Sequence, residues 1–378
     1  MKKRFLIFSF FVLIALCGFA QTDTNNPVIT AVPSLTIAPD ARAGGMGDVG
    51  AATAPDVNSQ YWNPAKYSFM ESEVGVSLSY TPWLSKLVSD INLVYASGYW
   101  KFDELQSVSA SLRYFSLGDI SLMDELGYPQ QGSAHPNEYA FDIAYSRLLS
   151  TKFSASVALR YIRSDLNNGV NINGGTEMYP GNAFAADVAG YYRTPITMAT
   201  GDANLALGFD ISNIGSKISY DENETSNFIP TNLRIGGSFD YPMDAYNRFS
   251  FSADVNKLLV PTQNDMTIEE YSDISSINGI FKSFNDAPGG FNEELKEVMW
   301  SVGAEYAYNN QFFVRAGYFN ESQEKGNRKY FTAGAGFKLN VFQLDAGYVI
   351  ATSQSNPLDQ TLRFSLSFDL NGLRNLAK

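Results

Sequence analysis

Few side chains in this chain have the types and spacing that catalysis requires. The 378-residue sequence contains one histidine, His135, and one cysteine, Cys17. A Ser-His-Asp hydrolase could be built around His135, but no G-x-S-x-G nucleophile motif lies near it. One histidine and one cysteine are also too few for the usual zinc or haem ligand sets. We therefore expect a protein that is not an enzyme and that needs no metal or cofactor.

Two other segments have residue patterns that occur in ligand sites. The glycines of PDARAGGMGDVGAATAPD (39–56) look like a dinucleotide-binding loop. A βαβ unit is not indicated around them, because no strand is expected before them and no acidic ribose partner follows. The acidic run 221–224 could hold calcium weakly, but a solvated loop is the simpler interpretation. Neither segment predicts a bound cofactor.

The charged residues with the most regular placement lie in the middle of segments where apolar and polar residues alternate. An arginine that faced lipid at the bilayer midplane would cost roughly 2–4 kcal/mol. If the same residues face inward, acids and bases can pair across the interior. We interpret them as a paired polar interior, with a charged permeation path as the alternative. The residues are Arg113, Asp142, Arg160, Asp187, Asp210, Arg234, Asp254, Glu305, Arg315, Asp345 and Arg363.

Alternation of this kind recurs from residue 73 onward. Near the end of the chain, Leu362, Phe364 and Leu366 share one face of an expected strand, and Arg363 and Ser365 share the other. A strand repeats every two residues, so each such segment has one apolar and one polar face. Fourteen strands are expected, near 73–81, 89–100, 105–116, 138–149, 152–164, 182–193, 203–213, 231–241, 246–256, 297–308, 312–320, 329–339, 341–350 and 360–370.

Short and long connections alternate between these expected strands. Those at 242–245 and 309–311 are short, whereas 117–137, 165–181 and 257–296 are long. Outer-membrane barrels have this alternation of tight periplasmic turns and longer outer loops, and a soluble sandwich has no reason for it. Aromatic residues reach 14% while charged residues stay at 17%, as is usual for such barrels. The sequence predicts an all-β fold, a transmembrane antiparallel barrel of about fourteen strands.

The first twenty residues have the features of an export signal. Basic residues 2–4 precede an apolar run at 5–16, and Gly18-Phe19-Ala20 forms a small-x-small cleavage site. A lipoprotein signal at Cys17 is the alternative, but the residue before it is a leucine, which is not small. We expect cleavage before Gln21, which removes the only cysteine and changes the net charge from −12 to −15. Such acidity argues against nucleic acid as a partner.

Beyond this signal, no window approaches the ~18 consecutive apolar residues of a membrane helix. The expected organisation has four parts. A signal peptide (1–20) precedes a turn-rich, plug-like N-terminal segment (21–72). The outer-membrane barrel (73–370) and a short tail (371–378) follow.

The long connection 257–296 is the least barrel-like part of the sequence. Ile277, Ile280, Phe281 and Phe284 recur at helical spacing, which predicts an amphipathic turn of helix. A turn signal at 286–290 and a second short helix from residue 292 follow. The apolar residues could fold the loop over the barrel mouth as a lid, or they could form a docking surface for another protein.

Three segments together resemble one protein family. PDARAGGMGDVGAATAPD, SQYWNPAKY (59–67) and IFKSFNDAPGGFNEELKEV (280–298) occur in the order and form typical of the PorV family of the Bacteroidota type IX secretion system. The triplet Asn63-Pro64-Ala65 by itself resembles only the N-terminal motif of the wider FadL-type barrel superfamily. The resemblance spans essentially the whole mature chain.

The resemblance implies a fourteen-stranded FadL-like barrel in the outer membrane that acts as a shuttle. Its implied partners are the SprA (Sov) translocon, the C-terminal domains of secreted cargo and the PorU sortase attachment complex, with outer-membrane lipid around the barrel. By this analogy the outer loop contacts the translocon or the cargo. The expected contact residues are Phe281, Phe284, Pro288, Gly289, Gly290 and Phe291.

The alternative function is that of a FadL-like transporter of hydrophobic small molecules. In such a transporter, the charges listed for the barrel interior would lie beside an apolar ligand, at a cost in desolvation. The interior charges therefore disfavour transport, and a ligand pocket near the barrel mouth stays an open alternative.

Overall fold

The fold of the chain is given by a computed structural model. The structure describes residues 26–85, 88, 90–123, 129–167, 179–199, 201–221, 225–263, 266–352 and 358–370. The expected signal peptide 1–20, the tail 371–378 and residues 222–224 of the acidic run lie outside the described residues.

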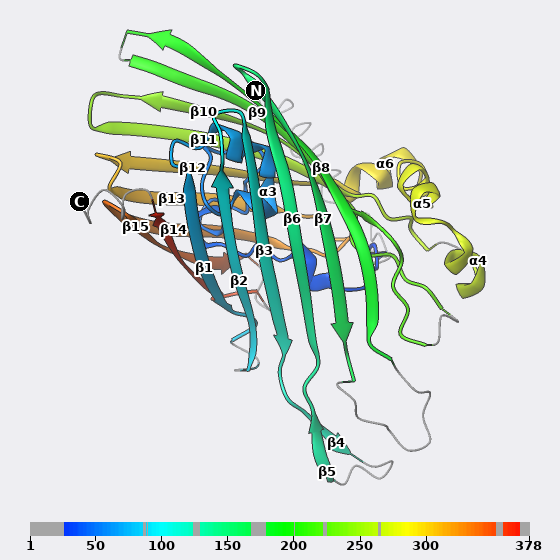
Figure 1. Cartoon of the computed structure of the whole chain (residues 1–378). Coiled ribbons are helices and arrows are strands. Elements are labelled where there is room, and N and C mark those ends of the chain that lie inside the picture. The colour runs from blue at the N-terminus through cyan, green and yellow to red at the C-terminus, as the bar shows by residue number, and fades with distance from the viewer. Residues whose placement is uncertain are drawn as a thin grey trace, which may run out of the picture.

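Fourteen antiparallel strands close into a barrel (Figure 1), as the sequence predicts. Each strand pairs with its neighbours along the chain, and β1 (Val74–Pro82) closes the wall against β16 (Leu362–Asp369). On the inner side of this seam, Ser79 Oγ and Ser365 Oγ lie 2.7 Å apart. The other barrel strands are β2 (Ile91–Lys101), β3 (Gln106–Leu117), β6 (Asn137–Ser150), β7 (Phe153–Asp165), β8 (Gly181–Met198), β9 (Gly201–Gly215), β10 (Asn232–Pro242), β11 (Asn247–Leu258), β12 (Met299–Tyr308), β13 (Phe312–Asn320), β14 (Lys329–Leu339) and β15 (Phe342–Ala351).

The predicted strand positions agree with the wall, with two differences. β8 continues to Met198, five residues past its expected end, because its pairing with β9 extends to the tight turn at Gly201. The expected loop 117–137 contains a hairpin of its own, β4 (Ile120–Met123) and β5 (Pro129–Ala134), which pair with each other and not with the wall. Their sequences lack the alternation that marked the other strands.

The outer face of the wall is apolar. On β7, Val157 and Leu159 are 53% and 68% exposed, whereas the intervening Ala158 and the following Arg160 are buried. Exposed aromatic residues gather where strands meet the short turns, at Trp100, Phe102, Tyr145, Tyr246, Tyr306, Tyr308 and Phe312. An apolar band bordered by an aromatic girdle is the surface that a barrel presents to lipid. Among the described residues no helix is long and apolar enough to cross a membrane.

The N-terminal segment lies within the barrel, where it forms short helical turns (Figure 1). These are η1 (Pro33–Thr36), α2 (Ala41–Gly44), α3 (Ser59–Trp62) and η2 (Pro64–Phe69). Val32 and Leu35 pack on Ala140 and Ile162 of the wall, and the Ala41 amide donates to Ser365 Oγ at 2.8 Å. The segment therefore contacts strands that are far apart around the circumference.

The glycine-rich stretch 44–50 is explained by close approach to the wall. A Cβ on Gly45 would lie 2.9 Å from the Gly334 Cα, so two backbones touch there. Gly47 has φ +73° and a Cβ on it would lie 2.7 Å from the Tyr318 amide nitrogen. Glycine adopts this conformation without steric cost and adds no side chain. The motif that looks like a dinucleotide loop is thus a packing surface.

Candidate docking loop

The connection between β11 and β12 forms three short helices beside one end of the barrel (Figure 1). They are α4 (Ile268–Asp273), α5 (Ser276–Lys282) and α6 (Phe291–Glu294), the last continuing into η3 (Leu295–Glu297). Thr267 and Glu270 form a capping box at the start of α4, and the Ser275 hydroxyl accepts from the Asn278 amide at the start of α5. Such caps satisfy amide groups that a short helix leaves unpaired.

An apolar surface on this loop faces outward. Phe281 is 73% exposed, Phe291 74%, Ile277 55% and Phe284 51%, while Ile280 is half-buried. The turn residues Pro288, Gly289 and Gly290 are also exposed. Large apolar side chains that gather on an exposed surface commonly mark an interaction site. We call Ile277, Phe281, Phe284 and Phe291 the aromatic face of the loop.

The turn before α6 depends on glycine. Gly290 has φ +67° and ψ −154°, a backbone conformation that residues with a Cβ rarely adopt. The amides of Glu293 and Glu294 both donate to the Gly290 carbonyl oxygen, at 3.0 and 3.1 Å. The glycine thus starts α6 immediately before Phe291 and sets where that ring emerges.

A cluster of ionic contacts fixes the loop to the barrel. Lys257 Nζ at the end of β11 lies 3.1 Å from a Glu294 carboxylate oxygen and 2.5 Å from one of Glu297. Lys325 Nζ, between β13 and β14, lies 2.6 Å from Glu293 Oε1 and 3.1 Å from Glu297 Oε1. Glu297 side-chain atoms are only 2% exposed. We call these five residues the anchor cluster.

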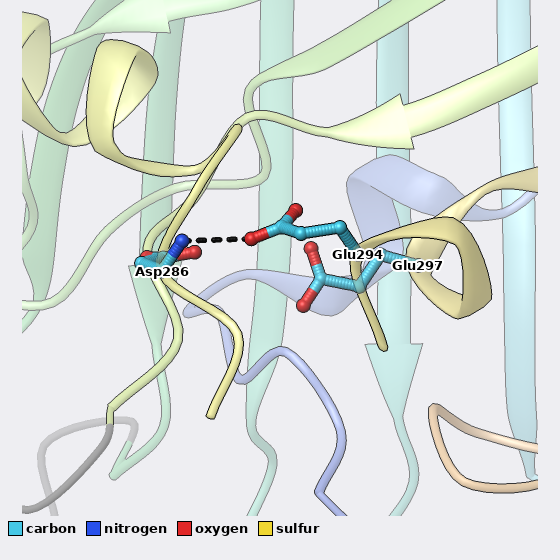
Figure 2. A group of neighbouring side chains, drawn as sticks. All are labelled: Asp286, Glu294 and Glu297. Carbon is cyan, nitrogen blue, oxygen red and sulfur yellow. Dashed lines mark hydrogen bonds between the residues drawn. The ribbon is translucent and has the colours of Figure 1, made fainter. Parts of the chain in front are cut away.

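The carboxylates also hold the turn that precedes α6. Figure 2 shows Glu294 extended toward Asp286, and Glu294 Oε1 accepts from the Asp286 and Ala287 amides at 2.7 and 2.9 Å. Asp286 Oδ2 in turn accepts from the Thr262 amide at 2.8 Å. These bonds fix the path of the chain between α5 and α6.

The surroundings shift the pKa values of these acids in opposite directions. Burial raises the pKa of Asp286 to about 6, and the nearby charges of Glu297 and Glu294 add to the shift. Burial opposes ionisation of Glu294 as well, but the Ala287 amide and Lys257 lower its pKa below the ordinary value. The lowered pKa of Glu293 has the same explanation, with burial outweighed by Lys325 and the Gly289 amide.

The three acids in Figure 2 have the composition of a cation site. One carboxylate oxygen from each of Asp286, Glu294 and Glu297 lies within 4.8 Å of the others. However, Lys257 and Lys325 already place ammonium groups on Glu294 and Glu297. Because lysine supplies the positive charge, the arrangement is an ion-pair cluster, and no metal is needed to explain it.

The eleven charges expected in the barrel interior are all buried in the structure. Arg160 pairs with Asp142 and Asp187 at 3.0 and 2.7 Å. Arg315 pairs with Glu305 and Asp345 at 2.6 and 2.7 Å.

Several of these residues instead bind the N-terminal segment. Two arginines donate to backbone carbonyl oxygens of this segment: Arg113 to Ile37 O at 2.9 Å and Arg234 to Trp62 O at 3.2 Å. Asp254 accepts from the Gly50 amide at 2.7 Å. Arg363 forms an ion pair with Asp48 at 2.5 Å. Asp210 lies 3.9 Å from Arg234.

The Asn63-Pro64-Ala65 triplet joins the N-terminal segment to three strands. Asn63 Nδ2 donates to Ala51 O and, across the lumen, to Gly190 O of β8, both at 2.9 Å. Its Oδ1 accepts from the Ala65 amide and so caps η2. The Pro64 and Ala65 carbonyl oxygens accept from Ser146 of β6 and Ser154 of β7 at 2.8 and 2.7 Å. The motif therefore attaches the N-terminal segment to the barrel wall.

His135 lies between β5 and β6 and contacts Ser133 and Asp119. Its Nε2 is 3.1 Å from Ser133 Oγ, and its Nδ1 is bonded to Asp119. This is the order of a hydrolase triad. The His135 and Asp119 side chains are, however, 52% and 68% exposed, whereas hydrolases rely on a water-excluded site with preorganised donors.

Sequence reasoning identified the aromatic face but not the anchor cluster. The spacing of Glu293 and Glu297 is helical and was visible, yet nothing local indicates that their lysine partners come from β11 and the β13–β14 connection. Helix α4 was also missed, because its six residues, Ile268–Asp273, are too few to show a helical repeat beyond Ile268 and Tyr271.

The fold is shared with solved outer-membrane channels. The structure resembles a deltaS2S3 mutant of the monoaromatic hydrocarbon channel TodX, with a TM-score of 0.53 and 11% identity over 87% of this chain and 98% of that one. It also resembles the Pseudomonas putida toluene transporter TodX, with a TM-score of 0.51 and 12% identity over 86% and 96%. For the monoaromatic hydrocarbon channel CymD the values are 0.51 and 12% over 88% and 97%. At these identities the likeness concerns the fold alone. No curated protein matches the sequence.

The closed wall, the apolar outer face and these neighbours define a transmembrane β-barrel with the fold of the hydrocarbon channels. A family profile described as "Type IX secretion system protein PorV" matches residues 20–265. The chain belongs to the PorV family of type IX secretion system proteins. The matched range ends within the β11–β12 connection, ahead of α5 and α6.

Proposed function

We propose that this protein is a non-enzymatic carrier in type IX secretion. It binds the SprA-type translocon and the C-terminal domains of secreted cargo, and it delivers cargo to a PorU-type attachment complex. The signal peptide 1–20 exports it to the outer membrane. The aromatic face of the β11–β12 loop is the contact surface, with Phe281, Phe284, Phe291 and the Pro288–Gly290 turn at its centre.

The observation that supports this proposal most directly is an exposed apolar surface on a rigidly held loop. Phe281 and Phe291 are each more than 70% exposed, although the loop beneath them is fixed by buried ion pairs. Ordering a loop on binding costs conformational entropy, and a loop that is already fixed avoids most of that cost. Aromatic side chains on such a surface are typical of the residues that dominate binding energy.

The test compares proteins that co-purify with tagged wild type and with a double variant, Phe281→Ser and Phe284→Ser. After extraction in mild detergent and mass spectrometry, wild type should recover a very large outer-membrane barrel and secreted proteins that share a C-terminal domain. The double variant should lose at least tenfold of that recovery, as loss of two binding-site aromatics predicts.

A matched control is Leu149→Ser, which removes an exposed apolar side chain at the short-turn end of the barrel. It should leave recovery unchanged. Equal recovery by the double variant would place the contact elsewhere, and a wild-type barrel that purifies without any partner would refute the carrier role.

Transport of hydrophobic small molecules is the second candidate, because the solved neighbours in the fold are named as hydrocarbon channels. In this chain the N-terminal segment runs through the interior and is bonded to the wall through Asn63, Arg234 and Arg363. Uptake of toluene by cells that express the protein, measured against cells without it, distinguishes this function. We expect no difference.

A further inference from the structure

A cavity of about 510 Å³ lies at the barrel end that carries the long loops, between the N-terminal segment, the wall and α4. Its volume falls within the roughly 300–1,000 Å³ range of small-molecule sites. Most of the lining is apolar and comes from Val32, Leu117, Leu166, Phe228 and Ile268, with Tyr220 and Tyr271 beside them. The aromatic face defined above does not contribute to it.

Among the described residues that line this cavity, the one carboxylate is that of Glu138, near the start of β6. It is 3% exposed, and its Oε1 accepts from Ser164 Oγ at 3.3 Å. The hydroxyl and the backbone amide of Ser34 also act on the carboxyl group as donors. Among the described residues, however, no donor makes a hydrogen bond of good geometry to Oε2. A buried carboxylate oxygen without a donor carries a desolvation cost that a ligand can remove.

Glu138 differs in this respect from the other acids of the same strand face. Asp142, two positions further along the inward row of β6, is paired with Arg160 at 3.0 Å. Arg113 acts on Glu138 only through space, because its guanidinium donates to Ser34 O and Ile37 O. Lys217, whose Nζ lies 4.2 Å from the centroid of the Phe228 ring, donates to Tyr271 O and Ser272 O.

We infer that this cavity binds a small organic amine, with an ammonium group on Glu138 Oε2 and an apolar body against Leu117, Phe228 and Ile268. A protonated amine supplies both the missing donor and the opposite charge, and a charge-assisted bond of this kind is stronger than a neutral one. An apolar body suits the part of the lining formed by Leu117, Phe228 and Ile268, which lies beside polar residues such as Asn227 and Gln263. This site is independent of the secretion role, because it shares no residue with the aromatic face.

Three probes of matched size test the inference on the full protein in lipid nanodiscs by titration calorimetry: 2-phenylethylamine, 2-phenylethanol and 3-phenylpropionate. The amine should bind saturably at one site, the alcohol at least tenfold more weakly, and the carboxylate not measurably. Glu138→Gln should weaken amine binding at least tenfold and bring it to the level of the alcohol.

Two further variants separate the charge from the cavity. Glu73→Gln makes the same chemical change at an exposed position at the short-turn end and should leave amine binding unchanged. Ile268→Trp fills the cavity without altering Glu138 and should weaken the amine and the alcohol alike. A heat-modifiability gel shift checks that each variant remains a folded barrel.

The inference is overturned if no probe binds, if 3-phenylpropionate binds as tightly as the amine, if Glu138→Gln leaves amine binding unchanged, or if Ile268→Trp does. Glu138→Gln should still recover the secretion partners in the co-purification experiment. Failure of the amine site and failure of the carrier role are thereby distinguishable.

Discussion

The interior arginines show how a single residue holds this barrel together. Arg160 binds Asp142, Asp187 and the Asn213 side chain, and its own side chain is 7% exposed. Removal of one member of a buried ion pair leaves its partners charged without compensation, which typically costs about 3–5 kcal/mol. Arg160→Ala should therefore lower the unfolding midpoint in a urea titration followed by heat-modifiable gel shift.

The matched variant for this experiment is Arg248→Ala. Arg248 also pairs with an aspartate on the neighbouring strand, Asp240 at 3.1 Å, but its side chain is 42% exposed. Exposed pairs contribute about 0–1 kcal/mol, so this variant should shift the midpoint only slightly. Equal shifts for the two arginines would show that burial of the Arg160 pair does not matter to stability.

Asp286 gives the docking loop a dependence on pH. Its pKa is raised from 3.8 to about 6 in the folded loop, so ionised Asp286 opposes the docked form above about pH 6, and that opposition fades as pH falls from 6 toward 4. The lowered pKa values of Glu293 and Glu294 act oppositely, because their stabilisation is lost as they protonate in stronger acid, below their usual 4.5. Loop stability should therefore rise as pH falls below about 6 and be highest near pH 4.5.

Asp286→Asn tests this dependence. The new amide keeps an acceptor for Thr262 and removes the charge, so the loop amides should exchange hydrogen more slowly at pH 7.5. The corresponding free energy of loop opening should rise by about 1 kcal/mol or less after solvent screening. The difference in loop stability between pH 5 and pH 7, which wild type should show, should disappear in the variant. Asp273→Asn, an exposed acid on the same loop, is the control and should keep the wild-type profile. An unchanged profile in Asp286→Asn would assign the dependence to another group.

At the scale of elements, the anchor cluster holds the docking loop in place but does not contribute to the pairing of the barrel strands. Glu297 bonds Lys257, Lys325 and Thr262, whereas the barrel strands are paired independently of it. Glu297→Gln should weaken the loop attachment by about 2 kcal/mol, the scale of a lost hydrogen bond to a charged group. Faster limited proteolysis within 261–298 and weaker partner recovery should follow, with an unaltered gel shift.

Glu324→Gln is the comparison for this variant. It removes a partly exposed ion pair with Lys296 in the same region, where the lysine side chain is 37% exposed. Proteolysis of the loop should stay close to the wild-type rate. If Glu297→Gln also stays at that rate, the loop is held by its apolar contacts, such as those of Phe228, Val260 and Ile274.

The sequence predicted the elements whose patterns are local and missed those that depend on distant contacts. The wall strands alternate with a two-residue period, so the inward position of Arg363 and the outward position of Leu362 can be predicted without knowledge of the fold. The β4–β5 hairpin has no such alternation and was missed. The aromatic face repeats at helical spacing and was found, but its anchors Lys257 and Lys325 lie in other elements. The sequence places Glu138 on the inward face of β6 like other acids, but it does not show that Glu138 lacks a basic partner among the described residues.

At the scale of the whole molecule, the path of the N-terminal segment was beyond sequence reasoning. A turn-rich, plug-like segment was expected, but not that it would run through the interior from one end of the barrel to the other. Asn26 N donates to Glu324 O beside the long loops at 2.9 Å, and Lys101 at the short-turn end donates to Met70 O at 2.9 Å. The glycines of 44–50 let the segment approach the wall closely, and several of the interior charges bind the segment. Packing of the segment inside the barrel therefore explains both the glycine-rich motif and the charged interior.

This arrangement also predicts the orientation of the barrel in the membrane. Barrels of this class place short turns in the periplasm and long loops outside, so the docking loop should be reachable from the cell surface. A cysteine at Asn285, an exposed position between α5 and α6, should react with a membrane-impermeant maleimide on intact cells. A cysteine at Ala245, in the exposed turn between β10 and β11, should react only after the outer membrane is permeabilised. The parent chain, which is expected to lose Cys17 with the signal peptide, measures background labelling. Labelling of Ala245→Cys alone on intact cells would reverse the orientation and remove the docking loop from any partner at the surface.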